Sequence, residues 1–148
     1  MIDPSILLRP PQNDAEWTAY YELRWRILRE PWQQPRGSER DELEHAALQL
    51  AAWDTQGKIL GVARLHREND HGIIRYMAVL PARQRRGIGG ALLERLEQQA
   101  RDWQLTAILL NARDAYRDFY RQMGYEIVGP GPTLFDVITH SRMRKRLK

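Results

Sequence analysis

Hydrophobic positions recur along the chain with two different periods, one typical of strands and one typical of helices. Short apolar or alternating runs between turn residues predict strands at residues 6–8, 48–53, 59–65, 73–79, 107–110, 125–128 and 135–143. Apolar side chains three or four apart predict helices at residues 13–28, 89–103 and 116–123. The order indicates an α/β fold, with an antiparallel meander first and then a crossover helix leading to a strand parallel to its predecessor.

The first helix has a clear start and an aromatic face. Asn13 precedes it and Glu16 follows three residues later, which is the spacing of a capping box. The side chains that recur on one face, and that we expect to pack, are Trp17, Tyr21, Trp25 and Leu28. Helical spacing alone accounts for this face, so it is predicted to pack or to line a groove rather than to react.

The helix at 89–103 divides more sharply into two faces. The set expected to face the sheet is Leu92, Leu93, Leu96, Ala100 and Trp103. The set expected to face solvent is Glu94, Arg95, Glu97, Gln98 and Arg101.

Composition narrows the class of protein. Hydrophobic residues at 43% and charged residues at 28% are ordinary globular values and predict one domain over residues 1–148. The chain has no cysteine, which excludes disulfides and a cysteine acyl-enzyme. No apolar run is long enough for a membrane span and no leader pattern is present, so we expect a cytoplasmic protein without a membrane partner. The net charge of +4 comes largely from two basic clusters without interleaved aromatics, which argues against nucleic acid as a partner.

No metal is expected. His66 and His71 lie near turns without a metal-ligand spacing, so both are interpreted as surface residues. The sequence leaves open whether two copies of the chain form a homodimer.

The segment from Arg75 to Leu93 stands out, because a strand runs into a basic, glycine-rich turn and then into a helix. Glycines admit close backbone approach, amides are free at a helix start, and arginines offer forked donors to phosphate. The turn therefore indicates binding of a diphosphate. A dinucleotide fingerprint needs glycine where Leu92 stands, and a Walker loop needs Gly-Lys-Ser/Thr, so both are excluded.

Gln84-x-x-Gly87-x-Gly89 resembles the acyl-CoA-binding signature of the GNAT superfamily of N-acyltransferases. A second stretch, from Phe119 to Glu126, is similar to the family's helix that carries a tyrosine shortly before a glycine-aromatic turn. The resemblance implies the GNAT fold. This is a mixed sheet of six to seven strands, splayed between the fourth and fifth strands and flanked by about four helices.

The resemblance also implies a set of residues that bind acetyl-CoA. The end of the fourth strand would bond the pantetheine arm and hold the oxyanion with backbone N–H groups, while the glycine turn would hold the pyrophosphate. An asparagine at the end of the next strand would bond the cofactor arm. These cofactor-binding residues are Met77, Ala78, Val79, Gln84, Arg85, Arg86, Gly87, Ile88, Gly89, Gly90 and Asn111.

By the same resemblance Tyr120 is the catalytic residue that faces the departing sulfur. A tyrosine pKa near 10 against a thiol pKa near 8.5 makes full proton donation uphill by about 2 kcal/mol, which favours hydrogen bonding to the nascent thiolate. The implied activity is direct transfer of an acetyl group from acetyl-CoA to a primary amine of a small molecule or peptide. The alternative is a catalytically silent acyl-CoA-binding or sensor domain, which needs no tyrosine at this position.

The acceptor side is less defined. Residues 39–45 form an acidic patch that either attracts a cationic amine or is a solvated turn with arginine partners. The fourth strand offers Arg75 and Tyr76 where many members of the family carry a glutamate base. His140-Ser141-Arg142-Met143 is similar to a His-x-x-Met ending of the ElaA-like branch, in which His140 is either a base or a hydrogen-bonded wall residue.

Overall fold

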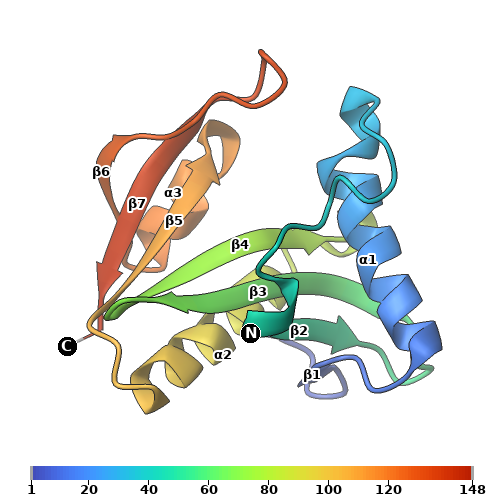
Figure 1. Ribbon diagram of the computed structural model, residues 1–148. Helices are drawn as coiled ribbons and strands as arrows, with labels where there is room; N and C mark the ends of the chain where they lie inside the picture. The colour runs from blue at the N-terminus through green and yellow to red at the C-terminus, as the bar shows by residue number, and fades with distance from the viewer. Residues whose placement is uncertain (1, 148) are drawn as a thin grey trace. The chain divides into compact units, whose positions relative to one another are not determined.

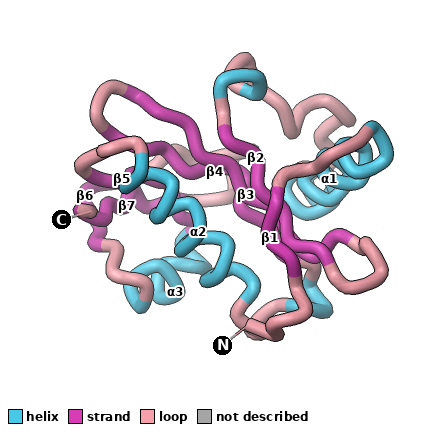
Figure 2. The backbone as a smooth tube through the Cα atoms, turned by 90° about the horizontal axis from the view of Figure 1, so that it is seen from below, coloured by secondary structure: helices cyan, strands magenta, loops and turns pink. Residues whose placement is uncertain are grey.

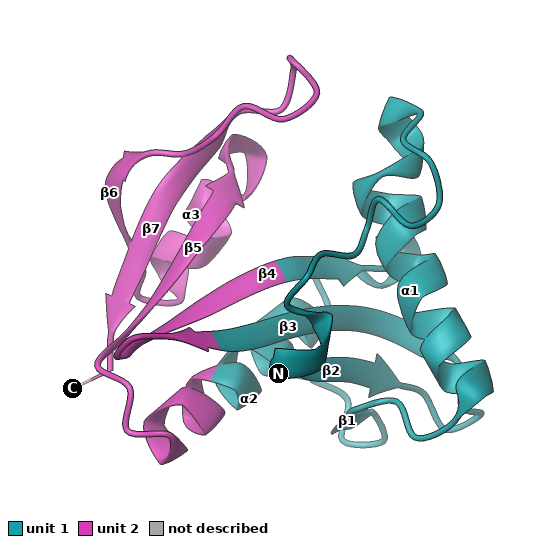
Figure 3. Ribbon diagram, in the orientation of Figure 1, with its two compact units in different colours: residues 1–66, 76–96 teal, residues 67–75, 97–148 magenta. Residues whose placement is uncertain are grey.

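The computed structural model describes residues 2–147, and the chain divides into two compact units (Figure 3). Unit 1 comprises residues 1–66 and 76–96, and unit 2 comprises residues 67–75 and 97–148. The prediction of a single domain over the whole chain stays a prediction.

Unit 1 contains an antiparallel arrangement of the early strands. β1 (Leu7–Arg9) pairs with β2 (Leu48–Trp53), and β2 pairs with β3 (Ile59–Glu68), with Leu50 opposite Ala63. The observed bounds of β2 are those predicted from the apolar run. β3 follows β2 through the turn at residues 54–57, so the predicted hairpin is confirmed.

Unit 2 contains the parallel pair. The first half of β4 (His71–Val79) runs parallel to β5 (Ala107–Arg113), from His71 opposite Ala107 to Ile74 opposite Leu110. β7 (His140–Arg146) is antiparallel to β5, and β6 (Glu126–Pro130) pairs with β7. Among residues 2–147 the sheet has seven strands in the order β1-β2-β3-β4-β5-β7-β6 (Figure 1), which confirms the mixed α/β sheet.

Three α-helices are present in the described part of the chain: α1 (Asp14–Leu28), α2 (Ile88–Asp102) and α3 (Arg117–Gln122). The remaining helical pieces are short 3₁₀ turns at Glu30–Trp32, Glu44–Ala46, Pro81–Arg83 and Asp114–Tyr116. The cap of α1 is the predicted one, because the side chain of Asn13 accepts a hydrogen bond from the backbone N–H of Glu16 at 2.9 Å.

Helices pack on both faces of the sheet in unit 1. Val62 belongs to a core cluster with Tyr20 and Leu23 of α1. A Cβ added at the neighbouring Gly61 would lie 3.2 Å from the side chains of Ile88 and Leu92, at the start of α2. Successive strand residues face opposite sides, so α1 and the start of α2 cover opposite faces of these strands, as Figure 2 also shows. Glycine at position 61 is what permits the close approach of α2.

The buried face of α1 differs from the predicted one. Tyr20, Leu23 and Arg24 are buried with Leu28, whereas Trp17, Tyr21 and Trp25 are only partly buried. Two of these aromatics contact the segment that follows α1. The indole of Trp25 donates to the carbonyl oxygen of Gln34 at 3.0 Å, and the hydroxyl of Tyr21 donates to Glu44 at 3.2 Å. A helix in contact with both a sheet and a covering loop buries more than one stripe, and apolar spacing alone does not show which stripe meets the sheet.

Two further local predictions are wrong. His66 is 3% exposed and not a surface residue, because β3 continues to Glu68 and keeps position 66 inside the strand. The last strand begins at His140 and not at Phe135, because Phe135 and Asp136 have left-handed φ values of 51° and 60°. Two such residues in a row form a turn and cannot continue a strand.

Candidate functional site

The glycine-rich loop of unit 1 connects the end of β4 to α2, as the sequence predicts. Arg85 and Gly87 have φ values of 63° and 84°, so both residues take left-handed conformations just before the helix begins. The side-chain amide of Gln84 donates to the carbonyl oxygen of Val79 at 3.2 Å and ties the loop to the strand that precedes it. Arg85 and Arg86 are exposed, and the first amides of α2 have no partner within the helix. This geometry suits an anion at the start of α2.

The second half of β4 also belongs to unit 1. Ala78 is 4% exposed, while Met77 and Val79 are partly buried. Their neighbour Tyr76 has a φ of 58°, a left-handed value inside a strand. This conformation costs a non-glycine residue about 1–2 kcal/mol and is typical of a β-bulge. It lies just beyond Ile74, the last residue of β4 in the parallel ladder with β5.

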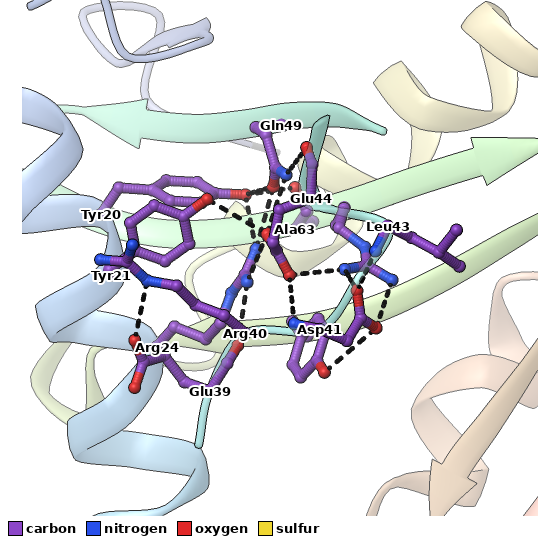
Figure 4. Close-up of polar contacts among 12 residues, drawn as sticks. Tyr20, Tyr21, Arg24, Glu39, Arg40, Asp41, Leu43, Glu44, Gln49 and Ala63 are labelled. Atoms are coloured by element: carbon purple, nitrogen blue, oxygen red, sulfur yellow. Dashed lines mark hydrogen bonds and ion pairs between the residues drawn. The ribbon is translucent and has the colours of Figure 1, made fainter. Parts of the chain in front are cut away.

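A group of buried charged side chains, called here the arginine cluster, lies on the α1 side of the unit 1 strands (Figure 4). Its members are Arg24, Asp41, Glu44 and Arg64. Arg24 of α1 donates to Oε1 of Glu44 at 2.9 Å and to the carbonyl oxygen of Glu39 at 3.0 Å. Both arginine side chains are 0% exposed, so their charges depend on the partners that the protein supplies.

The second arginine of the cluster holds two carboxylates. Arg64 donates to both oxygens of Asp41, at 2.7 and 3.0 Å, and to Oε2 of Glu44 at 2.6 Å. Glu44 therefore bridges both arginines. Burial alone raises the pKa of Glu44, but Arg24, the backbone amide of Asp41 and Arg64 together lower it below the ordinary value.

Tyr76 lies against this cluster. The guanidinium carbons of Arg24, Arg64 and Arg29 are 4.3, 4.8 and 5.6 Å from the centre of its ring. Each such contact contributes about 0.5–2 kcal/mol, so together they are large enough to offset the left-handed backbone of Tyr76. The phenol also donates to Asp41 at 3.4 Å. Burial raises the pKa of this phenol, with Asp41 as the next cause, so the hydroxyl stays protonated near neutral pH.

The arginine cluster carries a cost of its own. Among the described residues, the buried Nε atoms of Arg24 and Arg64 have no hydrogen-bond partner. An unpaired buried donor costs about 1–3 kcal/mol. The cluster is therefore not the arrangement that stability alone would favour.

The acidic patch predicted at residues 39–45 contributes Asp41 and Glu44 to the arginine cluster. Its arginine partners are present, but the patch is not a solvated turn, because the side chains of Glu39 and Glu44 are 5% and 8% exposed. Of its four acidic residues, only Glu42 is exposed. Most of the charge that was considered as an attractant for a cationic amine is thus already neutralised.

Tyr120 lies in unit 2, on α3. It is 9% exposed, and its ring meets those of Phe119 and Tyr125 edge to face at 4.9 and 5.8 Å. Burial raises the pKa of the Tyr120 phenol well above its usual value, and the neighbouring Tyr116 raises it further. A phenol of this kind donates a hydrogen bond and does not release its proton at neutral pH.

Two other predicted residues of unit 2 lie on neighbouring strands. Asn111 is an exposed residue of β5, opposite Arg142 of β7. His140 begins β7, and its Nδ1 lies 2.8 Å from the carbonyl oxygen of Pro132. That contact fits the hydrogen-bonded wall residue that the sequence left as one of two interpretations.

Unit 2 also contains a buried group that sequence reasoning missed, called here the lysine cluster: Glu97, Tyr125 and Lys145. Glu97 was expected to face solvent but is 2% exposed. It accepts hydrogen bonds from the hydroxyl of Tyr125 and from Nζ of Lys145, both at 2.9 Å. Helical periodicity alone predicts Glu97 on the outer face of the helix. It does not reveal Tyr125 and Lys145, which hydrogen-bond the buried carboxylate, because these residues lie far along the chain.

The structure groups the predicted site residues by unit. Met77–Val79 and the loop from Gln84 to Gly90 lie in unit 1, whereas Asn111 and Tyr120 lie in unit 2. That both sets address one cofactor stays a prediction from the sequence. Within residues 2–147, no three or more His, Asp or Glu side chains gather as metal ligands would, and no helix there combines the length and apolarity of a membrane span.

Comparisons with known proteins agree with this architecture. A model of the acetyltransferase (GNAT) family matches residues 17–125. The uncharacterized N-acetyltransferase YjcF of Bacillus subtilis (strain 168) is 25% identical over 134 residues, which cover 90% of this chain and 95% of YjcF.

Two solved structures illustrate the shared fold. A crystal structure of an aminoglycoside 6'-N-acetyltransferase complexed with coenzyme A is 16% identical, covers 97% of each chain and superposes with a TM-score of 0.80. Escherichia coli ElaA is 16% identical, with 98% of this chain and 99% of its own covered and a TM-score of 0.76. At these identities the structures show the fold alone. Because the family model matches most of the sequence, the chain belongs to the acetyltransferase (GNAT) family of acyl-CoA-dependent N-acyltransferases.

Proposed function

We propose that this enzyme transfers an acetyl group from acetyl-CoA directly to a primary amine of a small molecule or peptide. The observation that carries the proposal is the loop of unit 1, where Arg85 and Gly87 take left-handed conformations immediately before α2 in a chain of this family. The absence of cysteine from the sequence supports direct attack by the amine over a cysteine acyl-enzyme.

In the proposed complex the loop binds the pyrophosphate of the cofactor. The amides of Ile88, Gly89 and Gly90 point along the start of α2, where the helix dipole favours negative charge. Arg85 and Arg86 are exposed beside them and add forked, charge-assisted donors. Gln84 holds the loop through Val79.

The backbone of Met77, Ala78 and Val79 serves the thioester in this proposal. Its N–H groups polarise the carbonyl and hold the oxyanion that forms when the amine attacks. The nitrogen lone pair forms the new C–N bond, the C–S bond breaks, and the electron pair leaves on the sulfur of CoA. The extra proton of the amine passes to solvent. Asn111 is proposed to bond the cofactor arm.

Tyr120 is proposed to assist the departing sulfur. Its raised pKa makes complete proton transfer to a thiolate unfavourable, so stabilisation by hydrogen bonding is the main contribution. Support for this assignment comes from the motif at Phe119–Glu126.

The test is a panel of amines, peptides and aminoglycosides with acetyl-CoA, in which release of CoA is measured. The proposal expects turnover with at least one primary amine, and Tyr120→Phe is expected to lower kcat about a hundredfold while binding acetyl-CoA normally. Tyr116→Phe is the matched control, because Tyr116 is an exposed phenol four residues earlier. Normal turnover by Tyr120→Phe would refute the role of the hydroxyl. Binding of acetyl-CoA without turnover of any amine would instead indicate a silent acyl-CoA-binding domain.

A further inference from the structure

Tyr76 is the point at which the arginine cluster meets the backbone of β4. The ring of Tyr76 lies against two fully buried guanidinium groups, those of Arg24 and Arg64, at 4.3 and 4.8 Å. Both arginines are fixed in turn by Glu44, and Arg64 is also fixed by Asp41. The side chain of Tyr76 is therefore held by groups that cannot move independently.

The cluster is anchored to the core of unit 1 as well. Arg24 donates to the side-chain oxygen of Gln49 on β2 at 2.9 Å, and Tyr20 donates to the same oxygen at 2.7 Å. The same hydroxyl also lies 3.1 Å from the carbonyl oxygen of Ala63 on β3, as a second and weaker acceptor (Figure 4). These contacts link α1, β2, β3 and the segment around Glu44 to one another. A hydrogen-bonded network of this kind is rigid, so it restricts the movement of a side chain that packs against it.

The conformation of Tyr76 also affects the backbone of the next residue, Met77. Because peptide groups are planar, the two dihedral angles of Tyr76 set the direction of the amide of Met77. A left-handed Tyr76 directs that amide differently from a regular strand residue. Met77, Ala78 and Val79 are the residues whose amides are proposed to polarise the thioester.

We infer that the arginine cluster and Tyr76 together position the β4 backbone, holding Tyr76 in its left-handed conformation so that the following amides face the thioester carbonyl. The inference rests on the proposed function, since it concerns the oxyanion-binding part of that site. In this account Tyr76 and the four members of the arginine cluster are positioning residues. None of them touches the reacting atoms. The strained residue and the unpaired Nε atoms thereby have a functional explanation.

Two variants test the positioning of the β4 backbone by removing different contacts of Tyr76 and the arginine cluster. Tyr76→Leu removes the aromatic ring on which the guanidinium groups rest but leaves every ion pair of the cluster intact. Arg64→Lys keeps the positive charge but loses the fork that reaches both oxygens of Asp41 and also Glu44.

Arg9→Lys is the matched control. Arg9 donates to both oxygens of Glu16, at 2.8 and 2.9 Å, and its guanidinium lies 4.8 Å from the centre of the Trp53 ring. The Arg9→Lys variant therefore loses the same kinds of contact as Arg64→Lys, namely a bidentate pair with a carboxylate and a cation–π contact. Its partners lie in α1 and β2 and not in β4.

The readout is the infrared band of the thioester carbonyl in bound acetyl-CoA labelled with ¹³C at that carbon, recorded beside the calorimetric Kd of the same samples. Binding to the parent enzyme is expected to shift the band to lower frequency. In Tyr76→Leu and Arg64→Lys that shift should shrink and kcat should fall about tenfold, while the Kd for acetyl-CoA stays close to the parent value. Arg9→Lys should keep the full shift.

The outcomes separate the inference from the proposed function. If the parent binds acetyl-CoA and polarises it, and either folded variant keeps the full shift and the parent kcat, the positioning role is wrong and the proposed function stands. If the parent does not bind acetyl-CoA at all, the proposed function fails and the inference fails with it. A loss of the shift in Arg9→Lys equal to that in Arg64→Lys would also overturn the inference, because any weakened ion pair would then suffice.

Discussion

The arginine cluster of unit 1 and the lysine cluster of unit 2 both bury charge next to a tyrosine, but they meet the backbone in different ways. In unit 2 the chain turns at Gly124, with a φ of 95°, where a left-handed conformation carries no side-chain penalty. The stem of Lys145 fills the adjacent space, since its Cε would lie 3.2 Å from a Cβ at position 124. In unit 1 the left-handed residue beside the arginine cluster is a tyrosine, Tyr76.

This difference separates a structural role from a functional one. The lysine cluster ties α2, β7 and the turn before β6 together, with Nζ of Lys145 also donating to the carbonyl oxygen of Met123 at 2.8 Å. None of its three residues, Glu97, Tyr125 and Lys145, has a left-handed φ. The arginine cluster instead stabilises a conformation that a strand would otherwise avoid, beside the residues proposed to act on the thioester. We therefore expect damage to the lysine cluster to change stability, and mild damage to the arginine cluster to change activity.

The largest expected effect on stability comes from breaking the lysine cluster. Lys145→Met leaves the carboxylate of Glu97 buried without its cation, and removal of one partner of a buried pair costs about 3 kcal/mol or more. The free energy of unfolding in urea measures this loss. The double variant Glu97→Leu/Lys145→Met is the control and should recover most of it. If the single variant unfolds like the parent protein, the cluster does not stabilise unit 2.

A smaller effect is expected at the turn itself. Gly124→Ala should cost about 1–2 kcal/mol, because alanine is strained at positive φ and its Cβ meets Lys145. Gly57→Ala is the matched control, since Gly57 has a φ of 80° but no atom within 4 Å of an added Cβ. The difference between their unfolding free energies isolates the contact with Lys145. Equal losses would show that the stem of Lys145 simply moves aside.

The smallest effect concerns pH. The lowered pKa of Glu44 means that its contribution to stability is fully present above the pKa of the unfolded chain and is lost as the pH falls through the folded value. Urea midpoints between about pH 3 and pH 7 should therefore fall on acidification, and Glu44→Gln should reduce this slope. Glu42→Gln, at an exposed position in the same segment, should leave the slope nearly unchanged. Identical slopes in the parent and in Glu44→Gln would contradict the assigned ion pairs.

Local patterns predicted local structure well. The bounds of β2, the Asn13 cap and the passage from strand through glycine turn to helix all depend on residues close together in the chain. Their signals are side-chain period, capping chemistry and glycine placement, which act over a few residues.

Long-range features escaped this reasoning. Arg24, Arg64 and Glu97 were not recognised as buried, because charged residues are normally exposed unless paired and their partners lie 20 to 48 positions away. Arg64 nevertheless had a visible signal, since it occupies a position inside the apolar run of β3. The insertion of β7 between β5 and β6 was likewise not predicted, because strand pairing after a turn-rich connection leaves no periodic trace.

The central claim is that the loop from Gln84 to Gly90 binds the diphosphate of acyl-CoA, and calorimetric titration of acetyl-CoA into the enzyme tests it most directly. The account predicts saturable heat with one cofactor per chain, and an affinity about tenfold lower or worse in Arg85→Ala/Arg86→Ala. Arg95→Ala/Arg101→Ala, which removes two exposed arginines further along α2, should bind like the parent. No heat with the parent, or equal affinities in the two double variants, would contradict the account.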